Sequence, residues 1–169
     1  MGFQVKALNA CKLVSISAKS YTGASTGELQ FSNTLTGSSL TKTITYGAGS
    51  TAGRLNVTLD DLGGFGFYIV SLKEGGVEVA RRPLLLHCDI DCCLTKLTNE
   101  LIDCACDCPK CASSLAKAQK VFLLLQSALS TADIMSGSSD SFNSGFYQDI
   151  SDKYEKAKEI CDNSCGCDC

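Results

Sequence analysis

Cysteine is the residue type with the clearest chemical potential in this sequence, because 12 of the 169 residues are cysteines. Cysteine thiolates bind zinc in tetrahedral sites, and pairs of thiols oxidise to disulfides. The motif Cys108-Pro-Lys-Cys111 has the C-x-x-C spacing of half a zinc site, whereas the C-x-C pair Cys104-Ala-Cys106 fits both chemistries. The cysteines therefore predict metal binding or cross-linking, and the elements that position them decide which can act together.

Seven of the twelve cysteines lie in a segment that is predicted to form two helices joined by a hinge. Apolar residues of the first helix recur four, three and four positions apart, which places them on one face: Ile90, Leu94, Leu97 and Leu101. Apolar residues of the segment 115–132 repeat this pattern. Because proline is excluded from helix interiors, we expect the first helix to end before Pro109 and the second to begin after Cys111. Residues 87–134 are thus predicted to form a Cys-rich α-helical hairpin.

The length of the first helix sorts the cysteines into two groups. About 14 residues at 1.5 Å per residue give roughly 20 Å, so the two ends of the hairpin cannot share one site. At the foot of the hairpin we expect four cysteines, the foot cluster: Cys11, Cys88, Cys92 and Cys93. At the tip we expect eight, since a C-terminal helix running back up would add the last four: Cys104, Cys106, Cys108, Cys111, Cys161, Cys165, Cys167 and Cys169. These eight allow up to four disulfides, two zinc sites or free thiols, and all three remain open.

Residues 1–86 are predicted to form an antiparallel β-sandwich. Short apolar–polar alternations recur between turns rich in Gly, Ser and Thr. The segments 65–72 and 77–79 flank Gly75-Gly76, which is the pattern of a β-hairpin. The segment 83–86 is expected to be a short apolar linker that leaves the sheet and seats the sandwich rigidly on the foot of the hairpin.

The end of the chain is predicted to return to the hairpin. Residues 135–145 have the composition of a Gly/Ser tether, and residues 146–169 read as a C-terminal helix with a Cys-rich tail. The apolar stripe of that helix is thin, so we expect it to dock on the hairpin and complete a three-helix unit. The predicted fold class is α+β: an N-terminal antiparallel β-sandwich, a Cys-stapled helical hairpin and a C-terminal helix.

Composition excludes several classes of function. A net charge of -3 with no basic patch argues against nucleic acid as a partner, and no run reaches the roughly 20 apolar residues that span a membrane. No nucleophile–base pair or cofactor loop is visible, and the Gly-rich loop 47–53 lacks the ending of a phosphate loop. We expect no enzyme and no cofactor apart from zinc. His87, the single histidine, is expected to be packed or hydrogen-bonded, with a role as ligand at the foot as the alternative.

No secretory signal is visible at the N-terminus, which predicts a protein made in a reducing cytosol, where structural disulfides are rare. Twelve cysteines are therefore compatible either with metal thiolates or with a protein that is assembled inside a cell and later released by lysis.

One segment resembles a known module: Cys88-x-x-x-Cys92-Cys93-Leu-x-x-Leu97-x-x-Glu100-Leu-x-x-Cys104-x-Cys106-x-Cys108-x-x-Cys111, ending in Lys120-Val-Phe-Leu-Leu-Leu-Gln126. It is similar to the Cys-rich module of small virion structural proteins of marine and cyanobacterial tailed phages, where the module also follows a short β-domain. The motif covers residues 88–126 and the architecture residues 1–133; the tail from Cys165 to Cys169 is not part of it.

This resemblance implies a non-enzymatic structural subunit of a phage virion, associated with the tail, neck, baseplate or fibre. It would assemble in the host cytoplasm with other virion proteins, and cross-links would form after lysis. The alternative is a cytosolic zinc-binding interaction module. We also expect a homo-oligomer, because Val121–Leu125 presents apolar side chains all round its helix, more than two intramolecular neighbours can cover.

Overall fold

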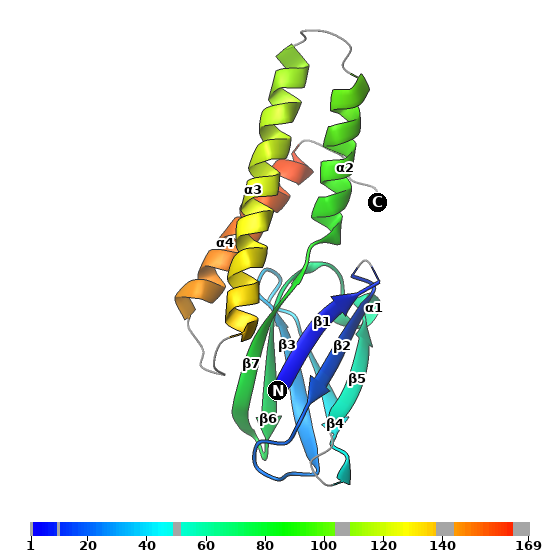
Figure 1. The fold of residues 1–169 in the computed structure, drawn as a ribbon, viewed down its shortest axis with the longest axis vertical. Helices are drawn as coiled ribbons and strands as arrows, with labels where there is room; N and C mark the ends of the chain where they lie inside the picture. The colour runs from blue at the N-terminus through cyan, green and yellow to red at the C-terminus, as the bar shows by residue number, and fades with distance from the viewer. Residues whose placement is uncertain (1, 10, 49–51, 104–108, 138–143, 164–169) are drawn as a thin grey trace.

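The structure is a computed structural model that describes residues 2–9, 11–48, 52–103, 109–137 and 144–163. Its class is α+β, as predicted: two antiparallel sheets precede the long helices, which rise from one end of the sheets (Figure 1). The strands are β1 (Phe3–Leu8), β2 (Leu13–Ala18), β3 (Thr26–Asn33), β4 (Ser39–Thr45), β5 (Gly53–Thr58), β6 (Gly66–Glu74) and β7 (Val77–Leu86). The helices are α1 (Leu59–Leu62), α2 (Cys88–Asp103), α3 (Pro109–Gly137) and α4 (Ser144–Asp162).

The strands form two sheets that face each other across one apolar core. One sheet has the order β1-β2-β5 and the other β4-β3-β6-β7, and all neighbouring strands are antiparallel. The alternation of β2 shows how the sequence builds this core: Val14, Ile16 and Ala18 are fully buried, whereas Ser15 and Ser17 are not. Alternate residues of a strand point to opposite faces, so the period-2 pattern correctly predicts which side chains enter the core.

The four-stranded sheet is covered on both faces where β6 and β7 meet the helices. Tyr68 and Leu84 point into the sandwich core, whereas Phe67 and Leu85, one position away in the same strands, belong to the core of the helices. Strands buried on two sides contain near-continuous apolar runs, as β6 and the end of β7 do. The segment Pro83–Leu86 is therefore not a linker, as predicted, but the end of β7, paired with β6. Proline is tolerated here because β7 is the edge strand of its sheet.

The turn between β6 and β7 confirms the predicted hairpin. Gly75 and Gly76 both have positive φ, 57° and 81°, and Glu74 pairs with Val77 across this two-residue loop. Two positive φ angles are the requirement of a type I′ turn, which glycine meets without strain. The sequence analysis missed two elements of this half, strand β1 and helix α1. Helix α1 has only four residues and is fixed by a capping box between Thr58 and Asp61.

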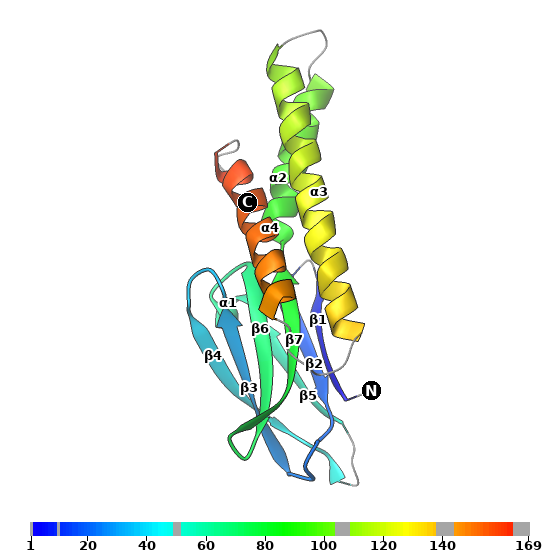
Figure 2. The ribbon, with the colours of Figure 1, turned by 90° about the vertical axis from the view of Figure 1, so that its left-hand side faces the viewer.

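The three long helices pack together, and α4 lies on α3 and against the outer face of β6 and β7 (Figure 2). Helix α3 begins at Pro109 rather than after Cys111, because the first position of a helix needs no N–H partner and suits proline. It contains 29 residues against 16 in α2, so it is roughly 20 Å longer. The extra length carries α3 past the foot of α2 and alongside β7 (Figure 1). Residues 135–137 and 144–145 of the predicted tether are helical, and residues 138–143 lie outside the described ranges.

At the opposite end of the sandwich, a buried carboxylate ties several loops together. Glu74 is 4% exposed and accepts hydrogen bonds from the backbone N–H groups of Tyr21 and Thr22 and from the hydroxyls of Ser20, Thr22 and Tyr46. Burial by itself would raise the pKa of Glu74, but the hydrogen bonds from Thr22, Tyr21 and Tyr46 outweigh it and lower the pKa from 4.5 to about 2. Glu74 is therefore ionised in the folded protein well into the acid range.

This carboxylate predicts a specific acid sensitivity. Because the pKa of Glu74 is lower in the folded state, its contribution to stability is complete above about pH 4.5 and is lost as pH falls toward about 2. The variant Glu74→Gln is expected to lower the free energy of unfolding at pH 7 by about 1–3 kcal/mol and to flatten the dependence on pH between 4.5 and 2. Urea unfolding at pH 7, 4.5 and 3 measures both effects. Glu28→Gln, on the exposed side of β3, is the matched control. An acid profile of Glu74→Gln identical to that of the wild type would contradict this assignment.

Candidate functional site

The chemistry-bearing side chains of the described residues gather at the first turns of α2, where the sandwich meets the helices; we call this region the joint. Cys11, in the turn between β1 and β2, forms a disulfide with Cys88, the first residue of α2, with the Cα atoms 6.1 Å apart. One turn further along α2, Cys93 forms a disulfide with Cys161 of α4, with the Cα atoms 5.8 Å apart. Both separations are in the normal range for disulfides. The joint is thus cross-linked from α2 to the sandwich and from α2 to α4.

Cysteines of the predicted foot cluster lie at the joint, and Cys161 joins them there. Cys11 and Cys88 are bonded to each other, and Cys92 also belongs to a disulfide. The prediction that Cys161 lies at the tip of the hairpin is wrong, since Cys161 bonds to Cys93 at the foot. The reason is the length of α3: α4 starts level with the sheet, and the roughly 26 Å from Ser144 to Cys161 brings it only to the first turns of α2.

The remaining predicted tip cysteines are assigned neither to zinc binding nor to disulfides by the described residues. Cys111 lies in the first turn of α3. The other six fall outside the described residues: Cys104, Cys106, Cys108, Cys165, Cys167 and Cys169. For these positions zinc, disulfides and free thiols all remain predictions.

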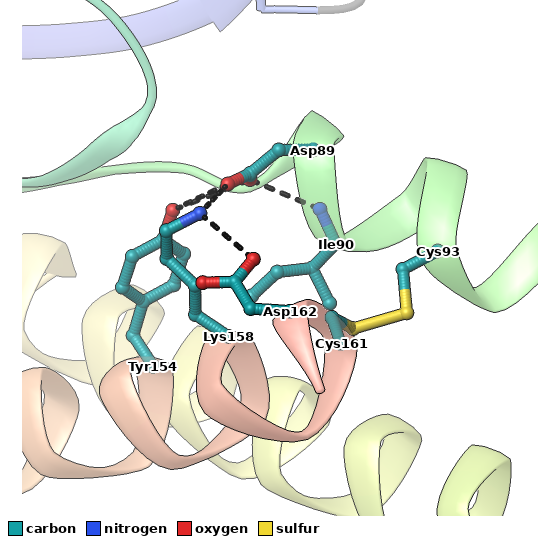
Figure 3. Close-up of polar contacts among 7 residues, drawn as sticks. All are labelled: Asp89, Ile90, Cys93, Tyr154, Lys158, Cys161 and Asp162. Atoms are coloured by element: carbon teal, nitrogen blue, oxygen red, sulfur yellow. Dashed lines mark hydrogen bonds and ion pairs between the residues drawn. A yellow bond between two sulfur atoms is a disulfide. The ribbon is translucent and has the colours of Figure 1, made fainter. Parts of the chain in front are cut away.

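A polar cluster beside the Cys93–Cys161 disulfide joins α2 to α4 (Figure 3). The Tyr154 hydroxyl donates to the carboxylate of Asp89, at 3.1 and 3.2 Å from its two oxygens. The Lys158 ammonium lies 3.3 Å from the same carboxylate and 3.6 Å from Asp162. The Asp89 carboxylate also accepts the backbone N–H of Ile90 at 3.0 Å. Every one of these charged or polar groups is therefore matched by a partner within the cluster.

The electrostatics of this cluster favour docking over proton transfer. Burial, and then the negative charge of Asp89, raise the pKa of Tyr154 far above its usual value, so the phenol keeps its proton. Burial lowers the pKa of Lys158, but the neighbouring carboxylates of Asp89 and Asp162 outweigh it and raise the pKa, so the ammonium keeps its charge. A cavity of about 310 Å³ lies beside the cluster and is lined in part by Phe65 and Asp89. Groups that neither gain nor lose protons near neutral pH hold α4 in place rather than perform acid–base chemistry.

A second cluster occupies the sandwich side of the joint. The backbone carbonyl of His87 accepts the N–H groups of Ile90 and Asp91, at 2.9 and 3.1 Å, which makes His87 the N-cap of α2. Its side chain turns toward the same helix turn, with Nδ1 3.1 Å from a carboxylate oxygen of Asp91. Ligand atoms of His87, Cys88 and Asp91 all lie within 4.8 Å of one another, the one such group of potential metal ligands among the described residues.

Sequence reasoning found part of this site. It placed Cys11 and Cys88 together, and it named His87 as an alternative ligand at the foot. It predicted neither the contact of Asp89 with α4 nor that of Asp91 with His87. The i,i+4 spacing of His87 and Asp91 was a usable signal. The partners of Asp89 were not readable, because they depend on where α4 docks.

Comparison of the chain with protein-family models, with curated proteins and with solved structures gave no significant match. None of the helices that the structure describes is long and apolar enough to cross a membrane.

Proposed function

We propose that this chain is a non-enzymatic structural subunit of a phage virion, an adaptor of the tail, neck, baseplate or fibre. The observation that carries the proposal is the joint. Two disulfides, Cys11–Cys88 and Cys93–Cys161, fix α2 to the sandwich and to α4, so the two halves of the molecule form one rigid body. A subunit that transmits force or sets a spacing needs such a joint, whereas many enzymes rely on hinges and lids that move.

A shared core supports the same conclusion. Phe67 and Leu85 of the sheet pack in one cluster with Tyr147, Ile150 and Tyr154 of α4. Apolar contact across an interface opposes relative motion because separating the parts would expose that surface to water. Virion assembly in the host cytoplasm followed by oxidation after lysis would supply the oxidising conditions in which these disulfides form.

The outer face of α3 supports assembly into a homo-oligomer with contacts to other virion proteins. Within the apolar run 121–125, Val121 and Leu125 are buried, but Phe122 and Leu123 are 55% and 63% exposed. Between Phe122 and Ile134, α3 contains a single charged residue, Asp133. An exposed apolar, charge-poor helix face of this kind is typical of a surface that meets another subunit.

Light scattering tests the oligomer. We expect the wild-type protein to have a mass that is a multiple of 17.9 kDa, and the double variant Phe122→Glu with Leu123→Glu to have a mass of 17.9 kDa, because buried carboxylates oppose association. Val77→Glu is the matched control, since Val77 is 66% exposed but is the first residue of β7, beside the hairpin turn at the far end of the sandwich. A wild-type mass of 17.9 kDa at all concentrations would refute the oligomer.

Quantitative peptide mass spectrometry of purified phage particles tests the virion assignment. The proposal expects peptides of this chain in the particles at a fixed copy number, retained through density-gradient purification. Peptides found only in the soluble fraction of infected cells would reject it. That result would favour the second candidate function, a cytosolic zinc-binding interaction module, which the grouping of His87, Cys88 and Asp91 supports.

A further inference from the structure

The joint contains a set of side chains whose chemistry the disulfide leaves unused. His87 and Asp91 flank the sulfur of Cys88, and the sulfur of Cys11 is bonded directly to it. The Nδ1 atom of His87 is buried and makes no hydrogen bond, although a carboxylate oxygen of Asp91 lies 3.1 Å away. A ring nitrogen and a carboxylate oxygen this close, with no hydrogen bond of acceptable geometry between them, are placed as two ligands of one cation would be.

We propose that reduction of the Cys11–Cys88 disulfide converts the joint into a zinc site, in which Cys11, Cys88, His87 and Asp91 each supply one ligand. Two thiolates, one imidazole and one carboxylate are a ligand set that zinc accepts and that hard ions such as magnesium do not. Tetrahedral bonds of about 2.0–2.1 Å place a nitrogen and an oxygen ligand about 3.3 Å apart. The 3.1 Å between His87 Nδ1 and Asp91 agrees with this spacing.

The backbone holds these ligands in place in either redox state. The N-cap carbonyl of His87 fixes the first turn of α2, and the i,i+4 spacing puts His87 and Asp91 on one side of it. Cys11 has a φ of 62°, a left-handed conformation that costs a non-glycine residue about 1 kcal/mol or more. The turn that imposes it is closed by a hydrogen bond from Lys12 N–H to the carbonyl of Asn9 at 3.1 Å. This turn, rather than the disulfide alone, brings Cys11 to α2.

The surroundings suit a bound ion. Cys11 is buried, which keeps water from the sulfur side of the site. The Asp91 side chain is 48% exposed, so the carboxylate lies at the surface and provides a path for the ion. In zinc-bound form the two sulfurs would be about 3.8 Å apart, from bonds of about 2.3 Å, which the 6.1 Å between the Cα atoms allows with small side-chain rotations.

The chemistry balances with a dithiol as the reductant. Thiol–disulfide exchange transfers two electrons and two protons from the dithiol, which becomes a disulfide, to the Cys11–Cys88 bond, which becomes two thiols. Zinc then displaces both thiol protons and binds the two thiolates. An oxidant of the disulfide class reverses the sequence and releases the ion. The sandwich therefore stays tied to α2 in a reducing cytosol, through zinc, and in air, through the disulfide.

Because His87 is the single histidine, its ring nitrogens report zinc at this site separately from zinc bound by other cysteines. The experiment records the ring-nitrogen resonances of His87 by NMR on the full ¹⁵N-labelled chain, with zinc added to saturation. In the protein reduced by a phosphine under argon, we expect one ring nitrogen to move to the shift of a zinc-bound imidazole. In the air-oxidised protein we expect no change. Circular dichroism on the same samples reports whether the fold persists.

Variants separate this site from zinc bound elsewhere. Cys11→Ser and Asp91→Asn are each expected to weaken zinc binding at His87 at least about tenfold. Cys93→Ser, which removes the neighbouring disulfide but no proposed ligand, is the control and should keep the wild-type response. If the reduced chain unfolds without zinc, the site is supported when added zinc restores helicity and also moves a ring-nitrogen resonance of His87 to the zinc-bound shift. Ring nitrogens that do not respond at zinc saturation, or a response unaffected by Cys11→Ser and Asp91→Asn, overturn it. The virion assignment does not depend on either outcome.

Discussion

Replacing Phe67 with alanine is expected to lower the free energy of unfolding by about 3–5 kcal/mol. Phe67 is fully buried on the outer face of the four-stranded sheet, and its ring lies 6.1 Å from that of Tyr147 in α4. Truncation removes apolar surface from the core that the sheet and the helices share and leaves a cavity between them. Urea unfolding, followed by circular dichroism, measures the loss.

Phe65→Ala is the matched control for this prediction. Phe65 lies two residues earlier in the chain and is 38% exposed, so we expect its truncation to change stability by less than about 1 kcal/mol. Equal effects of the two variants would contradict a core shared by sheet and helices, and would indicate instead that the helices pack on the sandwich only loosely.

Removing the Cys93–Cys161 disulfide has the second large expected effect. Its two residues are 68 positions apart, and a loop of that length corresponds to about 4 kcal/mol in the chain-entropy account. The double variant Cys93→Ala with Cys161→Ala keeps the positions apolar, so the loss reports the cross-link rather than a buried polar group. We expect a lower urea midpoint and earlier proteolytic release of α4, measured on the oxidised proteins.

The Cys11–Cys88 disulfide stays intact in that variant, which confines the expected change to the helical half. Limited proteolysis should therefore cut between α3 and α4 first, while the sandwich persists as a resistant fragment. A variant with the same urea midpoint and the same digestion pattern as the wild type would contradict a stabilising role for this cross-link.

The sequence allowed the strands and the helical hairpin to be predicted, because their signals are local. Alternation in β2 and the glycine pair between β6 and β7 depend only on neighbouring residues. The segment Pro83–Leu86 was predicted to be a linker because a short apolar run directly before a helix looks like one in the sequence. It is a strand because it pairs with β6, and its outward-facing Leu85 is apolar because the helices cover that face, which the local sequence does not reveal.

The placement of Cys161 shows the same limit in the candidate site. Its position follows from where α3 ends, and α3 continues to Gly137, into residues whose composition suggested a tether. Because α3 is longer than α2 (29 residues against 16), α4 starts level with the sheet and not at the foot of the hairpin, and its 19 residues bring Cys161 only to the foot. The Asp89–Tyr154 contact was hidden for the same reason.

The pairing of the cysteines in air-oxidised protein tests the central claim, a joint closed by Cys11–Cys88 and Cys93–Cys161, most directly. After free thiols are blocked, cleavage before aspartate separates Cys88 from Cys93, because Asp89 and Asp91 lie between them, and Asp162 separates Cys161 from the tail. Fragment spectra of the linked peptides then distinguish Cys93 from its neighbour Cys92. The structure predicts peptides joined through Cys11 and Cys88 and through Cys93 and Cys161. Cys161 joined to a cysteine of the segment 104–111, or Cys11 found as a free thiol, would contradict it.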